Sequence, residues 1–147
     1  MAEMLTKLDA ARRQLVTAIR LHFADRDAVS VYTLATNAQE ILSTLCDKAG
    51  VRSLRSNIGR PAGMIDAEVQ SKLINPARNF FKHADRDPDG QWPNFEEADC
   101  DHILLMPCFD IKELEGKAPM EAQVFLTWYG ALHPANMPVP LAQAAAT

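Results

Sequence analysis

An arginine, an amide and a histidine stand close together in the middle of the chain. Arg78, Asn79 and His83 fall within one predicted helix, and Lys82 adds a second cation beside the histidine. Arginine neutralises phosphate charge, and histidine transfers protons near neutral pH. Asn79 and His83 are four residues apart, so they share one face of a regular helix. These residue types suit the binding or cleavage of a phosphodiester.

The residues before and around this group also favour an anion. Asn75 and Pro76 predict a helix start, which would put Arg78 in a first turn with free backbone N–H groups. The net charge of the chain is −4, but residues 48–86 carry eight basic and three acidic side chains. Residues 87–147 carry two basic and ten acidic side chains. An anionic ligand is therefore expected at the middle third of the chain.

The run Arg78-Asn79-Phe80-Phe81-Lys82-His83 resembles the signature of the HEPN superfamily, small helical bundles of prokaryotic toxin, defence and RNA-processing systems. The resemblance implies a homodimer in which two copies of the motif face one cleft. It also implies RNA cleavage without a metal or another cofactor, or RNA binding in inactive relatives. An antitoxin-like protein is a further partner that the resemblance suggests. Residues 79–88 are also similar to bacterial helical proteins to which no activity is attached.

The resemblance assigns a role to each motif residue. Arg78 would bind the scissile phosphate, His83 would transfer the proton at the 2′-hydroxyl, and Asn79 would orient His83. In some HEPN-like enzymes an acid on an earlier helix supports the site, and Glu40 is the residue in that place. Lys82 is the other supporting residue.

A second interpretation needs no chemistry. The chain is then a non-catalytic helical interaction module that forms a homo-oligomer. Arg78 would pair with an acid such as Asp85, and His83 would stack or cap a helix end. From the sequence, the HEPN-like interpretation ranks ahead of this alternative. Burial of Arg78 or His83 against its own chain would favour the second.

The acidic segment after the motif has the spacing of a calcium loop. Asp85, Asp87 and Asp89 occupy its first, third and fifth positions, Gly90 the sixth and Glu96 the twelfth. The eighth position is a tryptophan, and no second loop of this kind occurs in the chain. We therefore interpret the segment as an acidic turn, and a calcium-binding protein is the least favoured alternative.

The remaining sequence describes one helical domain. The 147 residues are 48% hydrophobic and 23% charged, which is typical of a globular protein. No apolar run approaches the roughly 20 residues of a membrane span, and no signal peptide is apparent. We therefore expect a cytoplasmic protein. Its three cysteines, an odd number, are expected to be buried thiols.

The apolar spacing predicts an all-α fold, an antiparallel helical bundle of five to six helices. The domain should span residues 1–133, followed by a loose Pro/Ala-rich tail over 134–147. Pro107 should split the helix that is predicted over residues 95–115. The predicted helices cover residues 3–23, 28–49, 67–74, 76–84, 95–115 and 119–133. Asp27 and Asp66 are the expected N-terminal caps of the second and third helices, and Gly50 should end the second. At Asn75-Pro76 the chain either starts a new helix or continues as one kinked helix.

Overall fold

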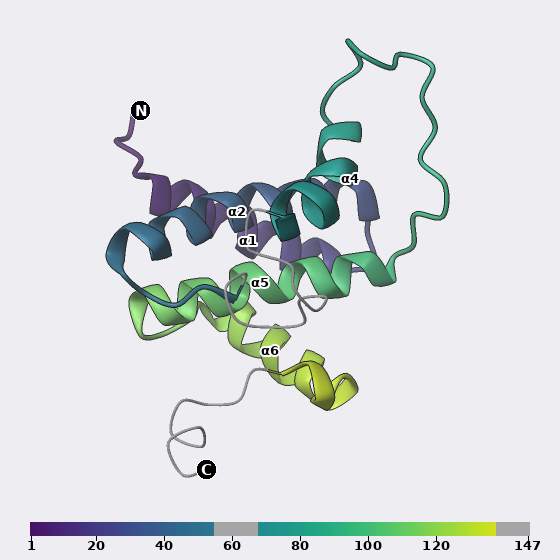
Figure 1. The fold of residues 1–147 in the computed structure, drawn as a ribbon. Helices are drawn as coiled ribbons and strands as arrows, with labels where there is room; N and C mark the ends of the chain where they lie inside the picture. Colours follow the sequence, from purple (N-terminus) through teal and green to yellow (C-terminus); the bar gives the residue numbers. More distant parts are fainter. Residues whose placement is uncertain (55–67, 138–147) are drawn as a thin grey trace.

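A computed structural model describes residues 1–54 and 68–137. These residues form five α-helices and no β-strand, which confirms the all-α prediction (Figure 1). A π-helical segment, η2, leads directly into α4, and a 3₁₀ turn, η3, follows α6. The bounds are α1 Lys7–Phe23, α2 Ala28–Ala49, η2 Val69–Ile74, α4 Asn75–Phe80, α5 Ala98–Glu115, α6 Met120–Leu132 and η3 Pro134–Asn136.

Side-chain caps set the ends of the first two helices. The Thr6 side chain accepts the N–H of Asp9 while the Asp9 carboxylate accepts the N–H of Thr6, so α1 begins at Lys7 rather than at residue 3. Asp27 caps α2 as predicted, because its carboxylate accepts the N–H of Ser30. Gly50 ends α2 in the left-handed conformation at φ +66°.

Two contacts fix the direction of α5 against α1. Arg12, near the start of α1, pairs with Glu115 at the end of α5. His22, at the end of α1, lies 3.0 Å from Asp101 at the start of α5. The two helices are therefore antiparallel, as α1 and α2 are across their short connection.

By contrast, α2 and α5 run parallel. The Cys100 thiol donates to the Ala28 carbonyl at 3.4 Å, and the Cys46 thiol donates to the Asp110 carbonyl at 3.6 Å. The start of α5 thus lies beside the start of α2, and a later residue of α5 lies beside a later residue of α2. The parallel pairing is possible because the chain returns to the start of α2 through η2, α4 and a long loop (Figure 1).

The core lies between α1, α2, α5 and α6. Its largest fully buried side chains come from all four helices, which makes them one packing unit. The three cysteines are free and buried within it, as predicted. The largest fully buried side chains of the core are Leu15, Ile19, Leu42, Leu104, Ile111, Phe125 and Tyr129.

Residues 69–80, which we call the arm, differ from the prediction. Of the two alternatives at Asn75-Pro76, the structure is closer to one continuous helix than to a restart: α4 begins at Asn75, but residues 69–74 are already helical and the Asn75 N–H donates to the Gln70 carbonyl. Arg78 therefore does not lie in the first turn of a separate helix. The helix also ends at Phe80 instead of residue 84. The change from π to α winding occurs where Pro76, which has no N–H, interrupts the hydrogen-bond ladder. The predicted cap at Asp66 lies outside the described residues.

The predicted break at Pro107 is also wrong. Pro107 lies inside α5, which continues unbroken to Glu115 and ends at Gly116 with φ +75°. Pro107 is buried, so packing on both sides of it compensates for the lost hydrogen bond. The last helix, α6, matches the prediction, and the tail beyond residue 137 lies outside the described residues.

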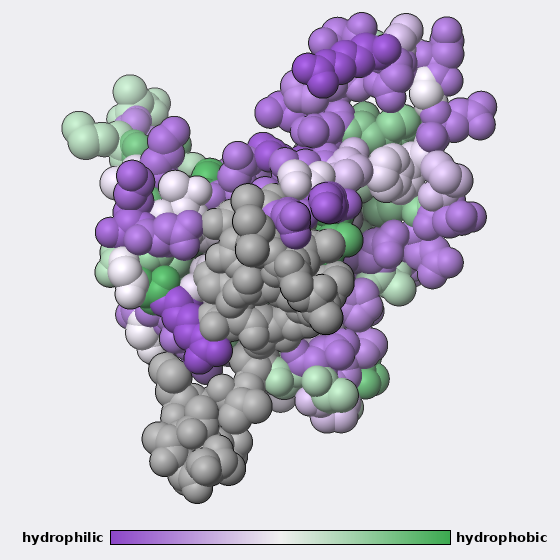
Figure 2. All heavy atoms as spheres, in the orientation of Figure 1, coloured by the Kyte–Doolittle hydropathy of each residue, from purple (hydrophilic) through white to green (hydrophobic). Residues whose placement is uncertain are grey.

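The loop over residues 81–97, which we call the outlying loop, leaves the arm, extends away from the bundle and returns at α5 (Figure 1). Nearly all of its side chains are exposed, and Figure 2 shows mainly hydrophilic surface over this region. Within the described ranges, none of the helices has the length and apolar character that crossing a membrane requires.

Candidate functional site

The arm is fastened to α2 through the motif arginine. The Arg78 guanidinium forms an ion pair with the Glu40 carboxylate. The Arg78 side chain is only 16% exposed, while that of Glu40 is 48% exposed. The Arg78 Nε atom is buried and has no hydrogen-bond partner among the described residues. Arg78 is therefore held against its own chain, and the two residues that the sequence singled out from separate helices do meet.

A chain of amides runs beside this ion pair. Gln39, fully buried on α2, donates from Nε2 to the Gln70 side-chain oxygen at 3.1 Å. Gln70 in turn donates to the Asn75 side-chain oxygen at 2.8 Å. These bonds join α2 to both the π-helical and the α-helical part of the arm. Buried polar groups that satisfy one another in this way fix one arrangement of the elements they connect.

Asn79 on the arm and His83 just after it face a different side of the molecule from Arg78. With Pro76, Phe80 and residues of the outlying loop, they line an open hollow of about 590 Å³, and Arg78 is not one of its lining residues. The His83 N–H donates to the Asn79 carbonyl at 2.9 Å, but no described hydrogen bond joins their side chains. Lys82 is exposed beside them. Within one chain, Arg78 and His83 therefore do not converge.

The acidic segment forms a turn. The Gly90 N–H donates to the Asp87 carbonyl at 2.8 Å, and a Cβ at Gly90 would approach the Asp87 carboxylate to 2.8 Å. Among the described residues, no three His, Cys, Asp or Glu side chains are placed to hold a metal ion. Asp85, Asp87, Asp89 and Glu96 are all among these described residues. The alternative of a formed calcium loop is thus not supported by the geometry of this segment.

The two phenylalanines of the motif pack within their own chain. Phe81 contacts Tyr32 and Phe95, with ring centroids 5.7 and 5.0 Å away. Phe80 contacts Phe81 and Trp92. They fasten the outlying loop and the arm to α2. Both phenylalanines are half-buried by these contacts.

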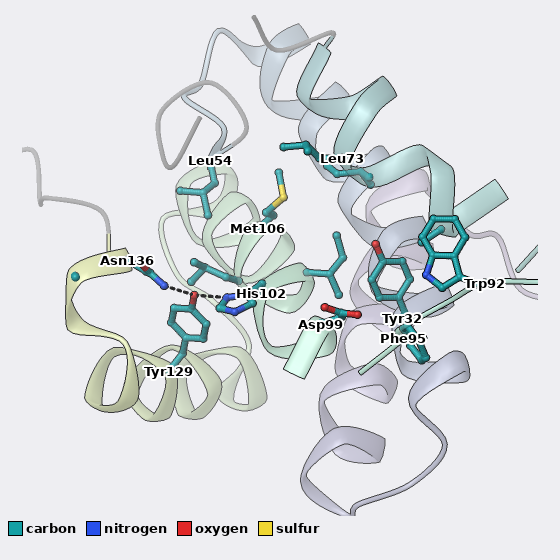
Figure 3. Close-up of a pocket in the computed structure, with 15 residues that line it drawn as sticks. Tyr32, Leu54, Leu73, Trp92, Phe95, Asp99, His102, Met106, Tyr129 and Asn136 are labelled. Carbon is teal, nitrogen blue, oxygen red and sulfur yellow. Dashed lines mark hydrogen bonds between the residues drawn. The ribbon is translucent and has the colours of Figure 1, made fainter. Parts of the chain in front are cut away.

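A hollow with a mainly apolar lining lies between the arm and α5, with a volume of about 590 Å³ (Figure 3). One side is formed by the arm and by aromatic side chains of α2 and the outlying loop. The other side is formed by α5, α6 and the turn after α6. We call it the arm pocket. Its apolar lining consists of Leu54, Leu73, Ile74, Ala77, Trp92, Phe95, Ile103, Leu105, Met106 and Ala135.

One end of the arm pocket is polar. The hydroxyl of Tyr129, a residue 1% exposed, accepts the Nδ2–H of Asn136 at 3.2 Å and lies 2.9 Å from His102 Nδ1 (Figure 3). The Tyr129 hydroxyl thus contacts two polar side chains, one from α5 and one from the turn after α6. The His133 ring packs against Tyr129 at 4.6 Å.

Asp99 and Tyr32 add two further polar groups to the arm pocket. Figure 3 shows Asp99 between the Tyr129–His102 pair and Tyr32. Burial raises the pKa of Tyr32 to about 12, and the Asp99 charge acts in the same direction. Burial likewise raises the pKa of Tyr129. Both phenols therefore remain hydrogen-bond donors at neutral pH, while Asp99 presents a carboxylate.

The sequence did not reveal this pocket. His102 and Tyr129 come from different helices, and Asn136 comes from the turn that follows, so no local spacing links them. The neighbours of His102 have separate roles, because Asp101 pairs with His22 and Cys100 is buried against α2. The only local signal was a histidine in the first turns of a helix with acidic residues around it.

The chain matches no protein-family model, no curated protein and no solved structure in the comparisons made. Its function is therefore inferred from its own geometry.

Proposed function

We propose that this protein is a helical binding module whose ligand site is the arm pocket. The observation that carries the proposal is the Arg78–Glu40 ion pair, in which the motif arginine holds the arm to α2. The arm supplies Leu73, Ile74 and Ala77 to the pocket wall. Arg78 thus acts through the arm: it positions one wall of a cavity and does not itself meet a ligand.

The size and lining of the pocket support this function. Its volume falls in the range of about 300–1,000 Å³ that is usual for small-molecule sites. Such sites combine apolar walls with a few oriented polar groups, and here those groups are Asp99, His102, Tyr129 and Asn136. Tyr129 is held by two hydrogen bonds, so this end of the pocket is preorganised.

Substitution of Arg78 tests the proposal. Arg78→Ala should lower the free energy of unfolding by about 1–2 kcal/mol, because it leaves Glu40 without its partner and removes a packed side-chain stem. His83→Ala and Arg86→Ala, which change exposed side chains, should each stay within about 0.5 kcal/mol of the wild type. Urea unfolding followed by circular dichroism measures all three. An Arg78→Ala protein as stable as the two controls would remove the support for a positioning role.

One specific contact favours a second candidate function, that of a HEPN-like ribonuclease or RNA-binding protein. The resemblance implies an acid on an earlier helix beside the motif, and Glu40 does contact Arg78. Asn79 and His83 share the open hollow, where RNA could reach them. Because Arg78 lies outside that hollow, this function requires a homodimer in which one copy supplies Arg78 and the other His83. A cytoplasmic location and an antitoxin-like partner belong to this candidate.

The second candidate has its own test. Purified protein is incubated with total RNA in the presence of a chelator, and its mass is measured by light scattering. The ribonuclease function predicts a dimer, cleavage that survives the chelator, and loss of cleavage in His83→Ala at an unchanged melting temperature. A 16.3 kDa monomer that leaves RNA intact would exclude it.

A further inference from the structure

We infer that the arm pocket binds a small organic amine in its protonated form. The inference rests on the proposed function, since it names the class of ligand that the module would hold. Among the described residues that line the pocket, Asp99 alone carries a fixed charge, and that charge is negative. Asp99 is an exposed residue, so its carboxylate is open to a ligand, and a bound cation would pair with it through a charge-assisted hydrogen bond.

Aromatic side chains on the same side of the pocket favour a cation further. Tyr32, Trp92 and Phe95 all line it, and the Tyr32 and Phe95 rings pack edge to face at 5.8 Å. The faces of aromatic rings attract ammonium groups because of their negative π density. Tyr32 lies close enough to Asp99 for the carboxylate charge to raise its pKa. The carboxylate and the rings are therefore arranged to act on one ammonium group.

The rest of the pocket fits the body of such a molecule. Leu54, Leu105 and Met106 supply an apolar surface away from Asp99. His102 lines the same pocket and keeps one ring nitrogen, Nε2, that does not contact Tyr129, so it offers the ligand one further polar contact. The expected ligand is thus an amine with an aliphatic or aromatic body and no negative charge.

Three naphthalene probes of one size test the charge preference. Naphthylmethylamine, naphthylmethanol and naphthylacetate are titrated into the full chain at neutral pH by isothermal calorimetry. The ammonium probe should bind about tenfold more tightly than the alcohol, and the carboxylate probe should bind most weakly. Asp99→Asn, which keeps the side-chain shape, should remove most of this difference. Asp89→Asn, at an exposed loop position, should leave it unchanged.

A blocking variant ties the binding to this pocket. Leu73 is 52% exposed on the arm and lines the pocket, so Leu73→Trp fills the opening without disturbing the core. It should weaken all three probes, with an unchanged circular dichroism spectrum. If no probe binds the wild-type protein, both the proposed function and this inference fail. If the alcohol binds and the amine binds no better, or if Asp99→Asn has no effect, the binding module stands and the inference of a cation fails.

Discussion

Among the described residues, one fully buried carboxylate joins α5 to the residues directly after α2. Asp110 is fully buried on α5, where one of its oxygens accepts the Leu54 N–H at 2.6 Å. Its carbonyl accepts the Cys46 thiol. The residue therefore joins α5 to the end of α2 and to the segment that brings Leu54 into the arm pocket. A buried acid of this kind must be satisfied by its surroundings, which makes its position sensitive to substitution.

Asp110→Ala should lower the free energy of unfolding by about 1–3 kcal/mol, because the buried Leu54 N–H loses its acceptor. Asp110→Asn retains one acceptor oxygen and should cost less than the alanine variant. Asp89→Ala, at an exposed acid, provides the control. Urea denaturation compares the three. Equal stability of the Asp110→Ala and Asp89→Ala proteins would contradict the assignment.

The buried cysteines should be chemically inert in the folded protein. Burial raises the pKa of Cys46 and of Cys100 to about 12, and it raises that of Cys108 well above its usual range. The reactive thiolate is therefore almost absent at pH 8. An aromatic disulfide reagent should show no fast reaction with the native protein and should titrate all three thiols in urea. Rapid native labelling would show that a cysteine is accessible.

At the scale of elements, glycines mark where two helices must end. Gly50 and Gly116 both adopt positive φ, and open space surrounds the position of a Cβ at each. The restriction there comes from the backbone alone. Gly130 is different, because it lies inside α6 with ordinary helical geometry. A Cβ there would approach the Met137 side chain to 3.4 Å, a normal contact distance.

Substitution by alanine should therefore change the stability in opposite directions at Gly50 and at Gly130. Gly50→Ala should destabilise the protein by about 1 kcal/mol, because alanine disfavours the left-handed conformation. Gly130→Ala should stabilise it by up to about 1 kcal/mol through the higher helix propensity of alanine. Thermal unfolding of the two variants measures both. A stabilising Gly50→Ala substitution would contradict the assigned helix end.

Local signals predicted the helices well and their breaks poorly. Asp27 and Gly50 act through neighbouring backbone groups, so the sequence places both ends of α2. Pro107 was expected to divide a helix, yet it lies inside α5. Pro76 was expected to start a new helix or to kink a continuous one, and it lies in the first turn of α4, which directly continues η2. Packing and side-chain bonds from distant residues hold these segments, and such contributions cannot be obtained from spacing along the chain.

At the scale of the whole molecule, the candidate sites differ in how far the sequence revealed them. The Arg78-to-His83 motif is contiguous, so it was found, although the sequence could not show that Arg78 faces α2. The meeting of Arg78 with Glu40 was suggested by the resemblance alone. The arm pocket joins residues from α2, the arm, α5 and the turn after α6, and only the tertiary structure brings them together.

Stability should decline in alkaline solution. The folded pKa of Cys46, Cys100 and Tyr32 is about 12, above the ordinary values of 9.0 for cysteine and 10.0 for tyrosine. Unfolding therefore releases protons above pH 9, and stability that is present below that pH is lost as the pH rises towards 12. Between its unfolded and its folded pKa, each group lowers the free energy of unfolding by up to about 1.4 kcal/mol per pH unit.

Urea midpoints at pH 7, 9 and 10.5 under reducing conditions measure this decline. Tyr32→Phe should flatten the profile only above about pH 10, where the phenol of the unfolded chain ionises. A midpoint that is constant from pH 7 to 10.5 would show that these groups titrate as they do in water.

The parallel pairing of α2 and α5 has a consequence for how the molecule is made. The segment over residues 50–97 separates the two helices, whereas α1 and α2 are joined by a short turn. The α1–α2 hairpin relies on contacts that are local in the chain, so we expect it to form early. The face of α2 that α5 covers has no partner until the ribosome has released the residues of α5. The nascent chain, more than the finished protein, is then the species most prone to self-association.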